Sequence, residues 1–219
     1  MKHSGAEIII HLLEQKGITT IAGIPGSANL PLYRALHDSS IKHILARHEQ
    51  GAGFIAQGMA RSTGNTAVCF ATSGPGATNL LTAIADAKLD SIPLVAITGQ
   101  VSTTVMGTNA FQEIDTYGLT IPISKHNFLV RSAAELLEII PLAFFIAESG
   151  RRGPVVIDVP KDIQLQECEF DQWRTYTFEE KEFYTDGNLK SLHQWNDTGP
   201  ENPLADEIYT FFSEKGDTL

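Results

Sequence analysis

The chain has 219 residues, of which 42% are hydrophobic and 19% charged, and its formal net charge is −10 at pH 7. This composition is that of an ordinary globular protein, and the length suits one α/β domain with an appendage. The negative charge, with no basic stripe along the sequence, excludes non-specific binding to nucleic acid. No stretch approaches the roughly 20 apolar residues of a membrane-spanning helix.

The cysteines and the first residues predict a reducing, cytoplasmic location. Cys69 and Cys168 are too few for a disulfide framework and lack the spacing of metal ligands. We expect no signal peptide in the opening MKHSGAEIIIHLLEQ, because Glu7 and His11 interrupt a short apolar run.

In chain order, apolar periodicity predicts alternating helices and strands. Ser4 and Glu7 form a capping box that opens a helix, and Gly17 ends it. Further helices are predicted at 30–37, 49–63, 77–88 and 133–150, and strands at 18–24, 41–47, 65–74, 92–99 and 153–160. Pro141 should kink the last of these helices.

Strand–helix alternation with almost continuously apolar strands is typical of a parallel sheet. We therefore predict an α/β fold, with a parallel sheet of about six strands and helices on both faces, over residues 1–165. Ligands of such folds bind beyond the carboxyl ends of the strands. The informative loops are then 24–29, 47–50, 72–79 and 99–113.

The pattern ends at about residue 166. Residues 171–219 hold 11 Asp or Glu against 4 Lys or Arg, together with aromatic residues in no regular period. We expect 166–219 to be a divergent, irregular acidic tail, disordered or carrying a short amphipathic helix around 204–212. It could be a linker, a fragment of a missing domain, or sequence foreign to the fold.

One carboxylate stands out in the stretch LARHEQGAGFIAQGMARSTG (45–64). Glu49 lies beside a run of Gly, Ala, Phe and Ile, where loss of hydration must be compensated by a partner or by a function. On these residues alone, Glu49 is either a functional acid or a carboxylate that the dipole of the following helix favours.

Several loops together resemble a known family. The segments are GIPGSANLPLY (23–33), RHEQGAGFIAQGMAR (47–61), ATSGPGATNL (71–80), DSIPLVAITGQV (90–101), GTNAFQEID (107–115), SKHNFLV (124–130) and GPVVIDVPKDIQ (153–164). In order and in register over residues 4–165, they resemble the N-terminal, pyrimidine-binding domain of thiamine diphosphate enzymes. Among these enzymes, the resemblance is to catalytic subunits of the acetolactate synthase family.

The resemblance implies a cofactor and the residues that bind it. In the family, the glutamate matching Glu49 hydrogen-bonds N1′ of the aminopyrimidine ring and favours the tautomer that removes the thiazolium proton. Pro25, Gly26, Thr72 and Asn79 match positions around thiamine diphosphate. The turn at 72–79 lacks the lysine of a phosphate-binding P-loop, so the diphosphate is expected elsewhere.

Other matched positions imply substrate and flavin contacts. Ala28, Phe111, Gln112 and Lys161 match residues near the substrate, and the Phe and Gln of the family reach the site of a neighbouring subunit. Taken without the family, Phe111 could fill an apolar gap and Lys161 could be an exposed charge. Arg151 matches an arginine that contacts FAD, although Arg152 replaces the usual proline after it.

Ile24, Ser27 and Asn29 also depart from the family's loop, which often reads GYPGG at its start. These departures leave substrate preference less defined than cofactor binding. The seven histidines show no metal-ligand spacing, so no metal site is predicted in this chain. In the family, Mg²⁺ and the diphosphate bind a C-terminal GDG motif that is absent here, and most of the FAD is held by a middle domain.

Three hypotheses follow from this half of a site. The chain is the N-terminal part of a transferase that condenses two 2-oxo acids with decarboxylation, in isoleucine and valine biosynthesis. Such an enzyme would be a homodimer or larger oligomer with a small regulatory subunit, and this chain alone would be inactive. Alternatively, it belongs to another thiamine diphosphate-dependent 2-oxo acid decarboxylase or oxidase, or it is a non-catalytic dimerisation or partner-binding module.

Overall fold

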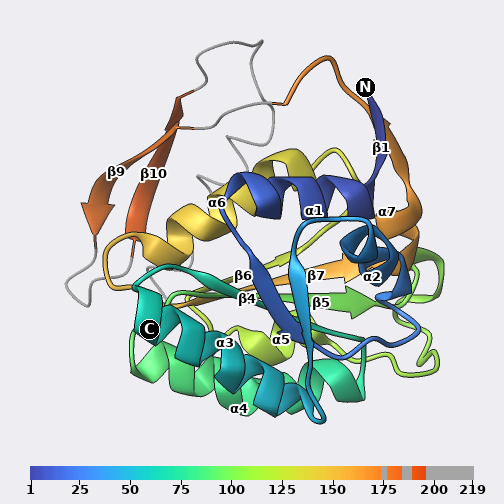
Figure 1. The fold of residues 1–219 in the computed structure, drawn as a ribbon, viewed down its shortest axis with the longest axis horizontal. Helices are drawn as coiled ribbons and strands as arrows, with labels where there is room; N and C mark the ends of the chain where they lie inside the picture. The colour runs from blue at the N-terminus through green and yellow to red at the C-terminus, as the bar shows by residue number, and fades with distance from the viewer. Residues whose placement is uncertain (174–176, 184–188, 196–219) are drawn as a thin grey trace.

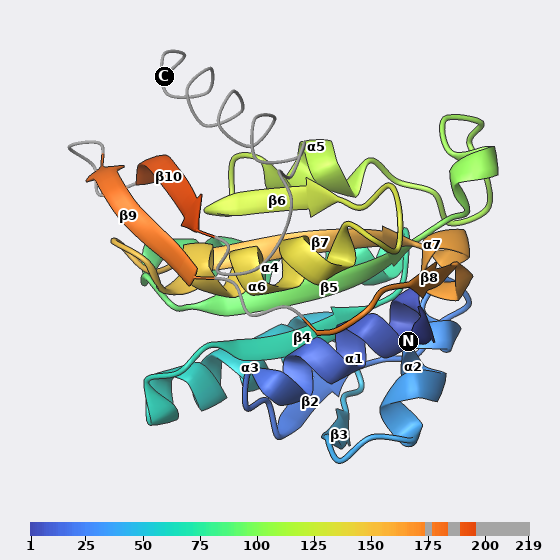
Figure 2. The same ribbon diagram turned by 90° about the horizontal axis from the view of Figure 1, so that it is seen from above.

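The computed structural model describes residues 1–173, 177–183 and 189–195. Its centre is a six-stranded sheet in the order β3–β2–β4–β5–β7–β6, in which every pair is parallel. The strands are β2 (Thr20–Gly23), β3 (Lys42–Leu45), β4 (Ala67–Ala71), β5 (Leu94–Gln100), β6 (His126–Leu129) and β7 (Pro154–Pro160). Figure 2 shows them in this order, from β3 at the bottom to β6 at the top.

Helices cover both faces of the sheet (Figure 1). On one face lie α1 (Gly5–Gln15), α2 (Leu30–His37), α6 (Leu136–Glu148) and α7 (Lys161–Leu165). On the other face lie α3 (Glu49–Thr63), α4 (Pro75–Leu89) and α5 (Thr116–Thr120). The parallel α/β fold predicted from the alternation is therefore confirmed.

The two faces of the sheet differ in the size of their side chains. Val68 and Phe70 of β4 point into the larger core beneath α1 and α6. Cys69, between them, points into a core of mostly small residues beneath α3 and α4. Burial raises the pKa of the Cys69 thiol to about 12, so it stays protonated and packs as a small apolar group.

One local prediction differs from the structure, and a second, the kink at Pro141, stays a prediction. The half-polar segment HNFL forms the edge strand β6, which the apolar-run criterion did not identify. Helix α6 includes Pro141 and continues past it to Glu148, and nine of its 13 residues are buried. Burial of these mostly apolar residues offsets the hydrogen bond that the proline removes.

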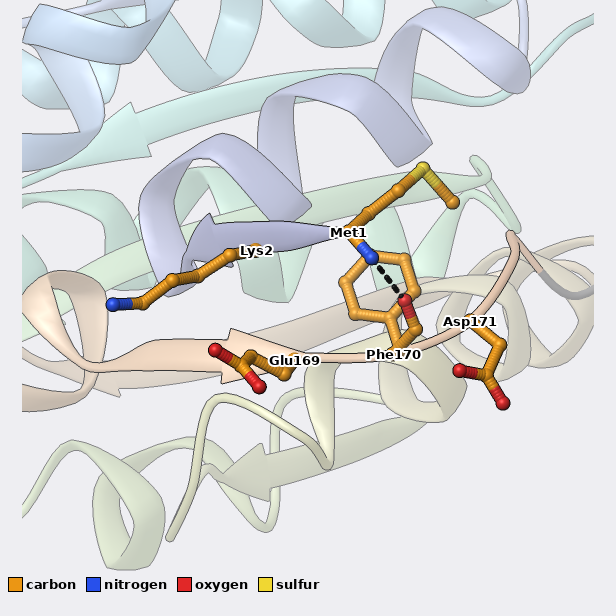
Figure 3. A pocket seen from close by; sticks show the side chains of 5 residues that line it. All are labelled: Met1, Lys2, Glu169, Phe170 and Asp171. Atoms are coloured by element: carbon orange, nitrogen blue, oxygen red, sulfur yellow. Dashed lines mark hydrogen bonds between the residues drawn. The ribbon is translucent and has the colours of Figure 1, made fainter.

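Ordered structure continues beyond residue 166. Strand β8 (Glu167–Glu169) pairs antiparallel with β1 (Lys2–Ser4), and the terminal amine of Met1 donates to Phe170 O at 2.6 Å. Figure 3 shows this bond and the open hollow lined by Met1, Lys2, Glu169, Phe170 and Asp171. These residues join the first residues of the chain to the segment that follows α7.

Further contacts follow β8. Trp173 stacks on His11 of α1 with ring centroids 3.8 Å apart. Strands β9 (Thr177–Phe183) and β10 (Leu189–Trp195) pair antiparallel. The aperiodic sequence did not predict these strands; the domain boundary at 165 stays a prediction, and the helix expected around 204–212 lies outside the described residues. Within those residues, no helix has the length and apolar character needed to cross a membrane.

Replacing either of two glycines of α3 with alanine should change the stability of the protein, in opposite directions. A Cβ on Gly53 would lie 2.6 Å from Ala83 Cβ of α4, whereas a Cβ on Gly58 would meet nothing within 4 Å. We expect Gly53→Ala to lower the free energy of unfolding by about 1–3 kcal/mol through overpacking. We expect Gly58→Ala to raise it by about 0.5–1 kcal/mol, because alanine favours the helix.

Urea unfolding of the full chain, followed by circular dichroism, measures both effects. Equal changes in the two variants would contradict the close packing of α3 on α4.

Candidate functional site

The predicted site residues, except Arg151, lie where the strands end. Because β2, β3, β4 and β5 are parallel, the loops that leave them share one edge of the sheet. Glu49 is the first residue of α3, directly after the loop that leaves β3. Its N-cap, His48, accepts a hydrogen bond from Gln50 N through Nδ1 at 3.2 Å, which fixes the start of the helix.

The carboxylate of Glu49 is held from one side. Asn79 Nδ2 of α4 donates to Glu49 Oε2 at 2.9 Å. The other oxygen, Oε1, lies beside Gly76, where a Cβ would be 3.5 Å from it. Among the described residues, Asn79 is the hydrogen-bond partner of this carboxylate, and Oε1 lies next to a residue without a side chain.

Thr72 contacts both the loop after β2 and the start of α4. A Cβ on Gly26 would lie 2.6 Å from Thr72 Cβ, and one on Gly76 would lie 2.8 Å from Thr72 Cγ2. Thr72 Oγ1 also accepts a hydrogen bond from Ala28 N at 3.3 Å. The missing side chains of the two glycines therefore let the loop after β2 and the start of α4 approach the same threonine.

The loop at 24–29 is fixed by further contacts from other elements. Asn29, fully buried, accepts from Gly26 N at 2.7 Å, and Gln164 Nε2 of α7 donates to Ala28 O at 2.8 Å. A Cβ on Gly99 would lie 2.5 Å from the same carbonyl oxygen. Gln164 was not identified from the sequence, because no local signal links α7 to a loop 136 residues earlier.

Tyr33 of α2 is a second residue that the sequence did not single out. Burial raises the pKa of its hydroxyl, and the nearby Glu49 carboxylate raises it further. The hydroxyl is buried and has no hydrogen-bond partner among the described residues. Its ring packs edge-on against Phe70 and His43, so the residue lines the sheet next to Glu49.

The loop with Phe111 and Gln112 reaches the same edge. A Cβ on Gly74, at the start of α4, would lie 2.5 Å from Gln112 O, so the loop rests on the turn that follows Thr72. Phe111 projects outward and is 84% exposed. Filling an apolar gap of its own domain is therefore not its role in this structure.

Lys161 and Arg151 lie apart from this group. Lys161 begins α7 after β7, at the same edge of the sheet and half-buried. Arg151 precedes β7, at the opposite edge, where its side chain donates to Ser91 Oγ at 2.9 Å and Leu89 O at 3.1 Å. Those bonds satisfy the carboxyl end of α4, which is a structural role for Arg151.

The buried carboxylate of Asp158 forms hydrogen bonds with side chains near the same edge of the sheet. Asp158 of β7 is 2% exposed and accepts hydrogen bonds from Thr98 Oγ1 at 2.6 Å and Gln100 Nε2 at 2.9 Å. Gln100 Nε2 also donates to Ile114 O at 2.8 Å. Burial raises the pKa of Asp158 to about 6, although its hydrogen bonds act in the opposite direction.

The described residues contain no group of three or more His, Cys, Asp or Glu side chains that could hold a metal ion. The polar groups at this edge instead suit a flat heterocycle. The carboxylate oxygen of Glu49 that lies beside Gly76 can form a hydrogen bond with a ring nitrogen.

Comparison with known proteins shows the family of this chain. The chain belongs to the thiamine pyrophosphate enzymes, because the family model of their N-terminal TPP binding domain matches residues 3–119. Thiamine pyrophosphate is another name for thiamine diphosphate, so the resemblance seen in the sequence is confirmed.

Acetolactate synthases are among the relatives. The chain is 63% identical over 171 residues to the acetolactate synthase isozyme 1 large subunit of Escherichia coli K12. This match covers 78% of this chain and 30% of the relative. The chain is 55% identical over 172 residues to the isozyme 2 large subunit of the same organism, covering 78% and 31%. With the large subunit of Corynebacterium glutamicum it shares 52% over 168 residues, covering 76% and 27%. The chain thus spans about a third of the length of these relatives or less.

Asp158 should make stability depend on pH. Its folded pKa of about 6 lies above the ordinary value of 3.8, so the folded chain holds this proton more tightly between the two values. Its contribution is fully present below about pH 4 and is lost as the pH rises through about 6. We expect the wild type to lose on the order of 2–3 kcal/mol more unfolding free energy than Asp158→Asn between about pH 4 and pH 7.

Urea unfolding of both proteins at the two pH values gives this difference, in which the effects of other carboxylates cancel. Equal losses in the two proteins would show that Asp158 does not titrate in this range.

Proposed function

We propose that this chain is the pyrimidine-binding part of an acetolactate synthase large subunit. The observation that carries the proposal is the Glu49 carboxylate, with Oε2 held by Asn79 and Oε1 beside Gly76. The similarity to large subunits at 52–63% identity supports it. The intact enzyme would join two 2-oxo acids, pyruvate with pyruvate or 2-oxobutanoate, with loss of CO₂, on the route to branched-chain amino acids.

Thiamine diphosphate, when bound, supplies a carbon nucleophile that no protein side chain offers. Glu49 would hold a proton at the ring nitrogen N1′ through Oε1. Asn79 donates to Oε2 through Nδ2, which cannot accept a proton, so it would keep the carboxylate oriented without competing for that proton. Pro25, Gly26 and Thr72 would form the wall of the pyrimidine pocket.

The remaining assignments concern the substrates and the rest of the enzyme. Ala28, Phe111, Gln112 and Lys161 would lie near the 2-oxo acids, with Phe111 and Gln112 reaching a neighbouring subunit. Mg²⁺ and most of the FAD would bind outside this chain, and Arg151 would contact FAD through N–H groups not used in capping α4. A homodimer or larger oligomer, a small regulatory subunit and a cytoplasmic location belong to the same proposal.

A second candidate is a non-catalytic module that dimerises or binds a partner. It is favoured by the outer side of α3, where Phe54 and Ile55 are 39% and 36% exposed and Gly51 and Gly58 face open space. Another thiamine diphosphate-dependent decarboxylase or oxidase is the third. Assays of acetolactate formation separate the first candidate from both.

Glu49→Gln tests the catalytic assignment. The 219-residue chain should form no acetolactate alone, and should form it with thiamine diphosphate, Mg²⁺, FAD and the separately expressed remainder of the Escherichia coli isozyme 1 large subunit. In that mixture, Glu49→Gln should reduce turnover at least about 100-fold, because an amide cannot hold the proton. Glu14→Gln on α1 is the matched control and should leave turnover unchanged; unchanged turnover in Glu49→Gln would refute the role.

Gly76→Ala tests the bare surface beside Oε1. The added methyl would press on Thr72 Cγ2 and narrow the approach to Glu49. We expect the half-saturating thiamine diphosphate concentration in the same mixture to rise about tenfold or more. Gly51→Ala, in open space two residues after Glu49, should not change it; equal affinities in all three proteins would place the ring elsewhere.

A further inference from the structure

The loop that carries Phe111 is folded around a carboxylate of its own. We call residues 107–113, between the 3₁₀ turn η1 (Thr103–Val105) and α5, the knuckle. Glu113 reaches back across it: Oε1 accepts from Gly107 N and Oε2 accepts from Ala110 N at 2.8 Å. Glu113 N in turn donates to Ala110 O at 3.0 Å, which closes the ring of hydrogen bonds.

The surrounding backbone stabilises the ionised form of Glu113. The N–H groups of Gly107 and Ala110, with smaller contributions from Asn109 and Thr108, lower the pKa of this carboxyl group. Hydrogen bonds to a charged acceptor are stronger than those between neutral groups. An amide in place of the carboxylate would turn an N–H₂ group toward one of the two donors.

The closed conformation of the knuckle has an energetic cost in its backbone. The same conformation determines the direction of the Phe111 side chain. Asn109 and Gln112 are non-glycine residues with φ of 59° and 58°, a region that such residues rarely adopt. Gln112 turned this way rests its carbonyl on Gly74, and Phe111 before it is left 84% exposed. The conformation of this loop therefore leaves the Phe111 side chain exposed to solvent.

Both ends of the surrounding segment are anchored independently of Glu113. Gln100 Nε2, itself bonded to Asp158, donates to Ile114 O at 2.8 Å. At the other end, Thr103 N donates to Asp162 Oδ1 at 3.0 Å. Loss of the Glu113 bonds would therefore loosen the knuckle while leaving its two ends in place.

We propose that Glu113 is a positioning residue that holds the knuckle closed, so that Phe111 projects and Gln112 stays on Gly74. What Phe111 and Gln112 meet rests on the function proposed above, in which they complete the site of a neighbouring subunit. Glu113 contacts neither cofactor nor substrate; it acts through the conformation of the two residues before it.

Amide hydrogen exchange of the full 219-residue chain tests the closed knuckle directly. We expect Glu113→Gln to speed exchange of a peptide spanning 105–114 about tenfold or more, because the Gly107 and Ala110 amides lose their charged acceptor. The matched control is Glu135→Gln, which removes a carboxylate that accepts from Arg131 N at 2.8 Å before α6. Unchanged exchange in Glu113→Gln, or an equal increase at 105–114 in the control, overturns the proposal.

A double-mutant cycle tests whether Glu113 acts through Phe111. In the reconstituted mixture, Glu113→Gln should lower turnover about tenfold while the half-saturating thiamine diphosphate concentration stays within about twofold. Added to Phe111→Ala, the same substitution should have little further effect, because the residue it positions is already gone. Equal losses in both backgrounds would overturn the proposal.

Glu49→Gln distinguishes this proposal from the function on which it rests. If Glu49→Gln keeps full turnover, the proposed function fails. The exchange of residues 105–114 then still supports or overturns the role of Glu113 in closing the knuckle.

Discussion

The side chain of Thr72 occupies space that two glycines leave open, and the geometry of the site depends on this contact. A larger residue at Gly26 or Gly76 would collide with it, and either collision would separate the loop after β2 from the start of α4. Helix α4 carries Asn79, which holds the Glu49 carboxylate. The position of the one acid at the site is therefore set by packing against the threonine as well as by its own hydrogen bond.

The two faces of the sheet contribute differently to function. Larger side chains beneath α1 and α6 form the main core, whereas small residues let α3 and α4 approach the sheet and each other closely. Both helices that carry the Glu49–Asn79 pair belong to the close-packed face. Close packing restricts the movement of a helix, so a carboxylate at its first residue is held in place before any ligand arrives.

Polar side chains hold the loops around the site by bonding to their backbone. The Asp158–Gln100 pair anchors the end of the loop beneath Phe111, and Glu113 closes the loop itself. Gln164 secures the opposite loop through Ala28 O. These are polar side chains used on backbone groups, and such bonds hold a loop in one conformation where apolar contacts alone would allow several.

The sequence by itself determined the parallel α/β fold, because apolar periodicity, capping residues and glycine-rich turns are local properties. The family followed from the resemblance of seven segments to a known family. The sequence also singled out Glu49, Thr72, Asn79 and the loops that carry them. Only the tertiary structure decided that Asn79 binds Glu49, that Arg151 caps α4 at the far edge, and that Gln164 reaches Ala28. Those contacts join residues 30 to 136 positions apart, and their geometry depends on how helices pack on the sheet, which no local pattern encodes.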